Sequence, residues 1–165
     1  MKRYLIISIC LGLALLNLLG CGKMEGTAHE HPRFTITLPD EWERVDTDGA
    51  VCFAPYGEPT ESSNIVFYVT EKSYYFSEFT QEDYAKYVKQ FTGYDTLTDV
   101  TLTNARISGW RAHRVVFSTR LHGAPAQIVL YAIDADQTFF FILLDVDGST
   151  EMFDAAMKSA KLFRQ

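Results

Sequence analysis

Apolar and polar residues alternate in several short stretches of the chain after residue 33. Phe34, Ile36 and Leu38 alternate with two threonines, a pattern that predicts a half-buried β-strand ending at Pro39. Further strands are predicted over residues 50–54, 64–71, 96–107, 110–120, 126–134 and 139–144. The last of these is an unbroken run of six apolar residues, typical of a central strand covered on both faces. Trp42 is expected in a loop or turn after the first strand.

The clearest helix is predicted to begin after Thr80 and to end near Gly93. Thr80 and Asp83 have the spacing of a capping box, in which each side chain accepts a hydrogen bond from the other residue's backbone N–H. Phe79 and Tyr84 stand at the positions of a hydrophobic staple. The buried face of this helix is expected to consist of Tyr84, Tyr87, Val88 and Phe91.

A second helix is predicted near the C-terminus, with Ser149 as its N-cap. Its apolar face is expected to contain Phe153, Ala156, Ala160 and Phe163. Tight turns at residues 122–123 and 134–137 favour antiparallel pairing of the strands around them. Because the central strand is apolar on both sides, both faces of the sheet need cover, which two helices can supply. The sequence therefore predicts an α+β fold, an antiparallel sheet of about six strands with helices packed on both faces.

The N-terminal segment has a different pattern. Lys2 and Arg3 precede a nearly unbroken apolar run over residues 4–16, as in a secretory signal peptide. The run is shorter than the roughly 20 apolar residues that span a bilayer, which disfavours a permanent transmembrane helix. The sequence Leu-Leu-Gly-Cys that ends at Cys21 resembles the lipobox of bacterial lipoproteins. The resemblance implies cleavage before Cys21 and a lipid on its thiol, and the alternative is an ordinary signal peptide with a chance cysteine.

This interpretation divides the chain into three parts. They are a signal peptide (1–20), a lipidated cysteine with a flexible tether (21–32), and one α+β domain (33–165). The part from Cys21 onward keeps 13 of the 15 Lys and Arg and all 21 Asp and Glu, a net charge of −8. That charge argues against nucleic acid and against electrostatic binding to anionic lipids. The expected partners are the membrane, through the lipid on Cys21, and an envelope protein or small ligand.

The domain resembles the PsbP-like family. The residues that carry the resemblance are Phe34, Ile36, Leu38, Pro39 and Trp42 of the opening strand, Gly109 and Trp110 before a later strand, and Phe153 of the closing helix. The resemblance covers roughly residues 33–165 in the order of the elements. It implies an antiparallel sheet between helices and a role as an accessory or binding protein. These are packing motifs, so the resemblance assigns no functional residue.

Cysteine and histidine provide few candidates for chemistry. Cys52 is the only cysteine after Cys21, so no intramolecular disulfide is expected within the domain. Its strand-like neighbours predict a buried, unreactive thiol. His29, Glu30 and His31 look like a metal cluster, but they lie in the predicted tether without a third fixed ligand. No metal or cofactor is therefore expected.

Other polar residues are also interpreted as structural. His113 and His122 flank one predicted strand, and neither has a partner identifiable from the sequence. The chain has no nucleophile elbow and no glycine-rich phosphate loop. The carboxylates Asp134, Asp136, Asp145 and Asp147 lie at strand ends and are expected in solvated turns.

The aromatic stretch of Tyr74, Tyr75 and Phe76, with Phe79 just beyond, has two interpretations. The rings pack over the sheet edge, or they form an interaction surface for a ligand or partner. Taken together, the sequence predicts a non-catalytic, membrane-anchored extracytoplasmic accessory or binding module. The alternative is a cell-envelope hydrolase with an unrecognised active site.

Overall fold

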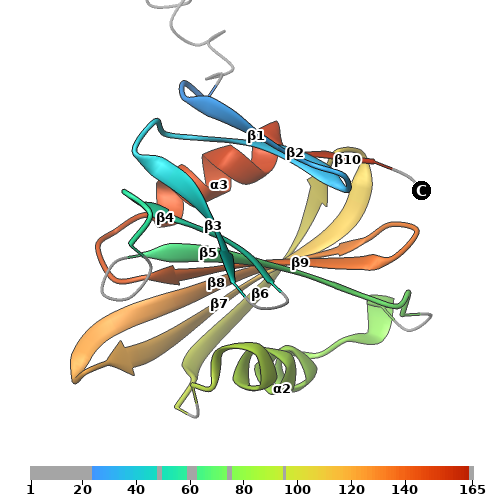
Figure 1. Ribbon diagram of the computed structural model, residues 1–165. Coiled ribbons are helices and arrows are strands. Elements are labelled where there is room, and N and C mark those ends of the chain that lie inside the picture. The colour runs from blue at the N-terminus through green and yellow to red at the C-terminus, as the bar shows by residue number, and fades with distance from the viewer. Residues whose placement is uncertain (1–23, 48–49, 59–62, 74–75, 95, 164–165) are drawn as a thin grey trace, which may run out of the picture.

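The computed structural model describes residues 24–163 except 48–49, 59–62, 74–75 and 95. The main layer is an antiparallel sheet of seven strands (Figure 1). In spatial order, these are β3 (Trp42–Thr47), β4 (Ala50–Pro55), β5 (Asn64–Thr70), β9 (Thr138–Asp145), β8 (Ala124–Asp134), β7 (Trp110–Leu121) and β6 (Thr98–Ile107). The apolar strand β9 lies in the middle and is buried along nearly its whole length, which confirms its predicted central position.

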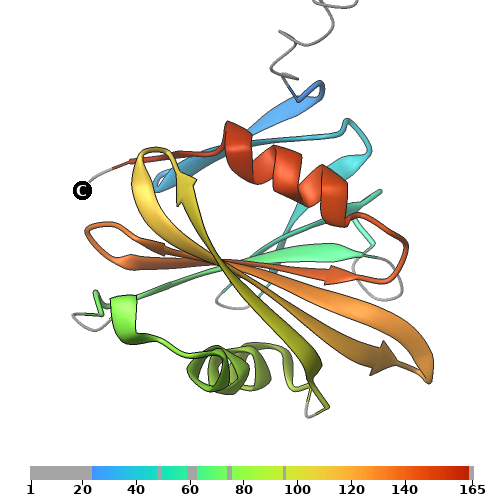
Figure 2. The same cartoon turned by 180° about the vertical axis from the view of Figure 1, so that it is seen from behind.

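Each face of this sheet is covered by a separate layer. A three-stranded sheet in the order β1 (Thr27–His31), β2 (Phe34–Leu38) and β10 (Lys161–Leu162) packs with helix α3 (Thr150–Ser159) on one face. Helix α2 (Gln81–Thr92) covers the other face, and a short 3-10 helix, η1 (Phe76–Glu78), precedes it (Figures 1 and 2). The fold is thus mixed α+β with antiparallel sheets, but it has two sheets of seven and three strands instead of one sheet of about six.

The prediction of a tether through residue 32 is wrong, because strand β1 lies within that segment. Each of its five residues pairs with β2. The ring of His29 contacts Phe53 edge-on at 5.2 Å, and the ring of His31 stacks on Phe34 at 4.8 Å. Imidazole rings therefore occupy the positions where a strand usually places apolar side chains, which is why the alternation was missed. Met24 already packs against the core, so the domain begins well before residue 33.

Gly26 is needed for this entry into the domain. Its φ is +145°, and a Cβ atom built there would lie 2.0 Å from the carbonyl oxygen of Leu38. A larger residue would therefore push β1 away from the end of β2. The backbone fits only because glycine has no side chain.

Helix α2 confirms its predicted boundaries. The Thr80 side chain accepts a hydrogen bond from the backbone N–H of Asp83, and the Asp83 carboxylate accepts one from the N–H of Thr80. Gly93 ends the helix with a left-handed φ of 73°. Tyr84 contacts the Phe79 ring at 5.5 Å, as the staple predicts, and its side chain is fully buried.

Three further residues test the predicted core. Trp42 is 4% exposed, so it is buried, but it begins β3 instead of lying in a loop. Cys52 is also buried, and burial raises the pKa of its thiol, which keeps it protonated at neutral pH.

Phe163 was expected on the face of the second helix, but α3 ends at Ser159 and the Phe163 ring is 42% exposed. The chain leaves the helix to pair β10 with β2, which turns Phe163 away from the core.

Candidate functional site

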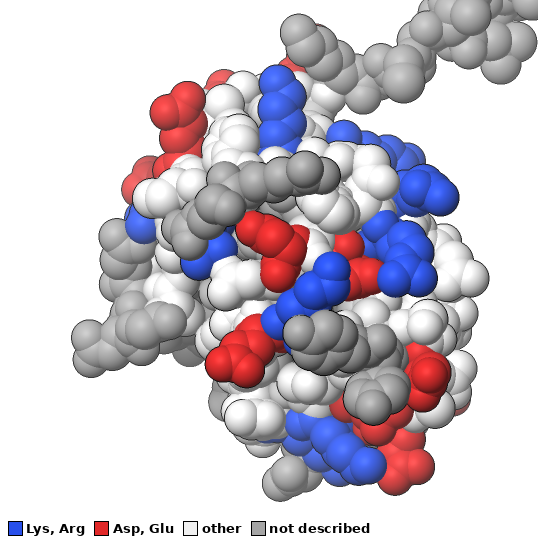
Figure 3. Space-filling model, turned by 90° about the vertical axis from the view of Figure 1, so that its right-hand side faces the viewer, with Lys and Arg blue, Asp and Glu red and all other residues white. Residues whose placement is uncertain are grey.

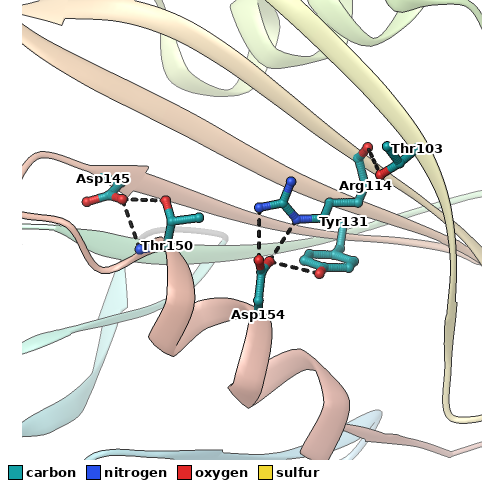
Figure 4. Close-up of polar contacts among 6 residues, drawn as sticks. All are labelled: Thr103, Arg114, Tyr131, Asp145, Thr150 and Asp154. Carbon is teal, nitrogen blue, oxygen red and sulfur yellow. Dashed lines mark hydrogen bonds and ion pairs between the residues drawn. The ribbon is translucent and has the colours of Figure 1, made fainter.

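The first polar cluster lies at the start of α3 and centres on Asp145. Its carboxylate accepts hydrogen bonds from the backbone N–H groups of Gly148 and Ser149 at 2.8 Å. It also accepts them from the backbone N–H of Thr150 at 2.9 Å and from the Thr150 hydroxyl (Figure 4). Burial raises the pKa of Asp145, but these bonds to its charged form outweigh burial and leave the pKa lowered. Ser149 is the N-cap residue of α3, as predicted, but its side chain makes no capping bond. The Asp145 carboxylate accepts the hydrogen bonds of the first N–H groups instead.

A second cluster joins α3 to the sheet. The Arg114 guanidinium of β7 donates two hydrogen bonds to the Asp154 carboxylate of α3, at 2.8 and 2.9 Å. The Tyr131 hydroxyl of β8 donates to the same carboxylate at 2.9 Å (Figure 4). Burial raises the pKa of Tyr131, and the neighbouring Asp154 raises it further, so the phenol stays protonated. The polar groups at both α3 clusters are engaged with one another, so these clusters hold the helix in place.

The opposite face carries the partner of His113 that the sequence did not reveal. The Tyr84 hydroxyl of α2 lies 2.7 Å from His113 Nδ1, and the imidazole stacks on Phe76 at 4.6 Å. Burial lowers the pKa of His113 and the Arg111 cation lowers it further, although Asp134 acts in the opposite direction. Burial likewise raises the pKa of Tyr84. Both groups are therefore neutral at pH 7, and they form a buried hydrogen-bonded pair.

Beside His113 the surface is hollowed into a depression of about 400 Å³. It is lined by Phe76 and Ser77 of η1, Asn104, Ala105 and Arg106 of β6, and Arg111, Ala112 and His113 of β7. The hairpin that joins β6 to β7 turns at Ser108 and Gly109, both with positive φ, as in a two-residue type I′ turn. This turn places Arg106 directly opposite Arg111. We refer to this hollow as the arginine depression.

The charges around the arginine depression are unevenly balanced. Arg111 pairs with Asp134 at 2.6 Å, and Lys72 approaches the same carboxylate at 4.0 Å. Arg106 donates to the carbonyl oxygen of Gly109 at 3.4 Å, and no carboxylate of the described residues forms an ion pair with it. Figure 3 shows Lys and Arg side chains interspersed with Asp and Glu on this side of the molecule.

The structure separates the residues that the sequence singled out. Cys21, Tyr74 and Tyr75 lie outside the described residues, and Phe76 is 2% exposed, so its ring belongs to the core and not to an exposed surface. Asp134 and Asp145 are 7% and 6% exposed, so they are not solvated turn residues as predicted. His122 lies in the β7–β8 turn, as expected. Within the described ranges, no group of three or more His, Cys, Asp and Glu side chains is placed to hold a metal ion.

Sequence reasoning missed Arg106 and Arg111. They are separated by a Ser-Gly turn and stand at equal distances from it, which is the signal that could have paired them. Without the type I′ register, however, their common orientation could not be inferred.

Known proteins were compared with the chain by sequence and by structure. No protein-family model matches it, and no curated protein matches it in sequence. A crystal structure from Bacteroides thetaiotaomicron is similar with a TM-score of 0.55 and 13% identity; the match covers 86% of this chain and 50% of that one. This chain therefore spans about half the length of that protein. LpqN, a protein involved in cell envelope biogenesis of Mycobacterium tuberculosis, is similar with a TM-score of 0.50 and 13% identity, over 85% of this chain and 91% of LpqN. These likenesses show a shared fold.

In the part of the chain that the structure describes, neither α2 nor α3 is long and apolar enough to cross a membrane.

Proposed function

We propose that the protein is a bacterial lipoprotein, held on the extracytoplasmic face of a membrane by lipid on Cys21, and that its domain is a non-catalytic accessory or binding module. The observation that carries the anchor is the order of basic residues, apolar run and Leu-Leu-Gly-Cys at the N-terminus. The structural neighbour LpqN is involved in cell envelope biogenesis, which agrees with an envelope location. We assign the domain to the PsbP-like family on the resemblance of its opening strand and closing helix.

The arginine depression supports a binding role. It combines two guanidinium groups with an amide and a hydroxyl around a hollow of about 400 Å³, which is within the range of small-molecule sites. His113, the imidazole in its wall, is neutral and already hydrogen-bonded through Nδ1 to Tyr84. That arrangement fixes the ring in place, which suits a recognition surface.

The anchor is tested by Cys21→Ser. Without the thiol no lipid can be attached, so we expect the variant to lose incorporation of radiolabelled palmitate and to leave the membrane fraction or remain unprocessed. Cys52→Ser is the matched control, because it removes the other cysteine after residue 20, and it should label and fractionate like the wild type. Full processing and membrane retention of Cys21→Ser would refute the anchor.

The binding role is tested by chemical crosslinking in intact cells. Arg106 is replaced by a photoreactive amino acid in one strain, and Arg120, at the far end of β7, in another. We expect a discrete adduct from position 106 that position 120 does not give. Equal, diffuse labelling at both positions would argue against a binding surface at the arginine depression.

A further inference from the structure

We propose that the arginine depression binds a phosphate monoester group. This inference deepens the binding role proposed above and rests on it, but it does not depend on the lipid anchor. It assigns a ligand class to a site formed by η1, β6 and β7.

The first argument is the pairing of like charges. Arg106 and Arg111 are directly opposite on neighbouring antiparallel strands, where Cβ atoms are about 5 Å apart. Like charges in that position destabilise a sheet. Asp134 balances Arg111, but Lys72 shares that carboxylate, so the three cations exceed the one anion. The part of the chain from Cys21 onward has a net charge of −8, yet at this hollow the cations outnumber the carboxylate that pairs with them, and a bound anion would relieve this excess.

The second argument concerns the kind of anion. A carboxylate has one charge and two oxygens, which a single guanidinium can satisfy through two parallel hydrogen bonds. A phosphate monoester has three terminal oxygens and a charge of about −1.5 to −2 at pH 7. Two guanidinium groups, with the Asn104 amide and the Ser77 hydroxyl in the same wall, match that larger number of acceptors.

The test measures affinity for glycerol phosphate by calorimetry, with the full-length protein in a non-ionic detergent. We expect Arg106→Gln to weaken binding by about tenfold or more, equal to ~1.4 kcal/mol. Arg120→Gln is the matched control, because Arg120 also donates to the carbonyl of a turn glycine, Gly123, but lies about 30 Å along β7. The affinity of the Arg120→Gln variant for glycerol phosphate should stay within about twofold of that of the wild type.

Three results would overturn the proposal. These are no binding of glycerol phosphate by the wild type, an equal loss in both variants, and binding of acetate as tight as that of glycerol phosphate. Arg111→Gln serves as a second variant if Arg106→Gln unfolds, and it should also lose about tenfold or more. A negative result for glycerol phosphate binding would not change the expected fractionation of Cys21→Ser. The phosphate proposal and the lipid anchor can therefore be refuted independently.

Reconstitution into vesicles distinguishes two sources of the ester. If a lipid headgroup is the ligand, phosphatidic acid in phosphatidylcholine vesicles will compete and raise the apparent Kd for glycerol phosphate. Phosphatidylglycerol at the same surface charge, which carries a diester, controls for electrostatic repulsion. A Kd that is the same with both lipids assigns the site to a soluble or polymer-borne phosphate ester.

Discussion

The two faces of the seven-stranded sheet are covered in different ways. One face packs against α3 and the three-stranded sheet, whose strands come from both ends of the described chain. The other packs against α2, a single helix formed by consecutive residues, with its neighbouring aromatic rings. The hairpin between β6 and β7 extends away from α2, as both ribbon views show. The arginine depression lies at this less covered end.

The polar groups on the two faces of the sheet also differ in how far they are paired with one another. On the α3 face, Asp145 accepts hydrogen bonds from the first turn of the helix, and Asp154 accepts them from Arg114 and Tyr131. On the α2 face, Arg106 lacks a carboxylate partner among the described residues. The α2 face also has paired groups, Tyr84 with His113 and Arg111 with Asp134, so the contrast lies in Arg106, which is available for a ligand at the end of that face.

The largest effect is expected from Trp42→Ala, which opens a cavity in the core of the α3 face. Deleting a buried aromatic of this size should cost about 3–5 kcal/mol, a large share of the ~5–15 kcal/mol stability of a domain. Urea unfolding of the protein gives the free energy. Phe163→Ala, which removes a 42% exposed ring, is the control and should change it by less than about 0.5 kcal/mol. Similar losses in both variants would mean that the Trp42 ring is not part of this core.

A smaller effect is expected from Asp145→Asn, which leaves N–H donors at the start of α3 without a charged acceptor. The cost at pH 7 should be about 1–3 kcal/mol. Ser149→Ala is the control, since the Ser149 side chain makes no capping bond, and it should cost less than about 0.5 kcal/mol. Equal losses in urea unfolding would show that the Ser149 side chain stabilises the start of α3 as much as Asp145 does.

The same variant gives a pH dependence. Because folding lowers the pKa of Asp145, its stabilising effect is complete above the unfolded value of about 3.9 and is lost as the pH falls through the lower folded value. The difference in unfolding free energy between the wild type and Asp145→Asn should therefore be constant from pH 7 to about pH 5 and shrink below about pH 4. A difference in unfolding free energy that grows as the pH falls would show that folding does not lower the pKa of Asp145.

The smallest effect on stability is expected from Arg106→Gln. It removes one of two like charges that face each other across β6 and β7, so the free energy of unfolding should stay within about 0.5 kcal/mol of the wild type or rise slightly. Thermal unfolding at low and high salt measures this, and any gain should fade with salt. A loss above about 1 kcal/mol would give Arg106 a structural role and remove the contrast between the faces.

The parts of the fold that depend on local sequence were predictable. The Thr80–Asp83 capping box and Gly93 define α2 within one or two residues, because both ends use bonds between near neighbours. The central position of β9 followed from its apolar run. Strands β1 and β10 were missed because the first buries histidine rings and the second has only two residues.

Pairings between distant residues were not predictable. Tyr84 and His113 are 29 positions apart, and Arg114 and Asp154 are 40 apart, so only the folded chain shows that they bond. Ser149 is the N-cap as predicted, but the Asp145 carboxylate accepts the capping hydrogen bonds because the turn between the two residues folds back and directs several N–H groups at it. The arginine depression needed the hairpin register, which shifts every side chain to the other face if it slips by one residue.

If Cys21 carries the proposed lipid, the early start of the domain would limit how far the domain could move from a membrane. Met24 packs against the core, so only three Cα–Cα steps of 3.8 Å, about 11 Å at full stretch, separate it from Cys21. That length is roughly one and a half to two times the depth of one headgroup layer, which is about 5–8 Å. A lipid on Cys21 would therefore hold the β1 side of the domain against the bilayer and direct α2, at the opposite end of the molecule in Figure 1, away from it. The domain would sample ligands in a thin layer at the membrane surface, and a partner would have to come to it.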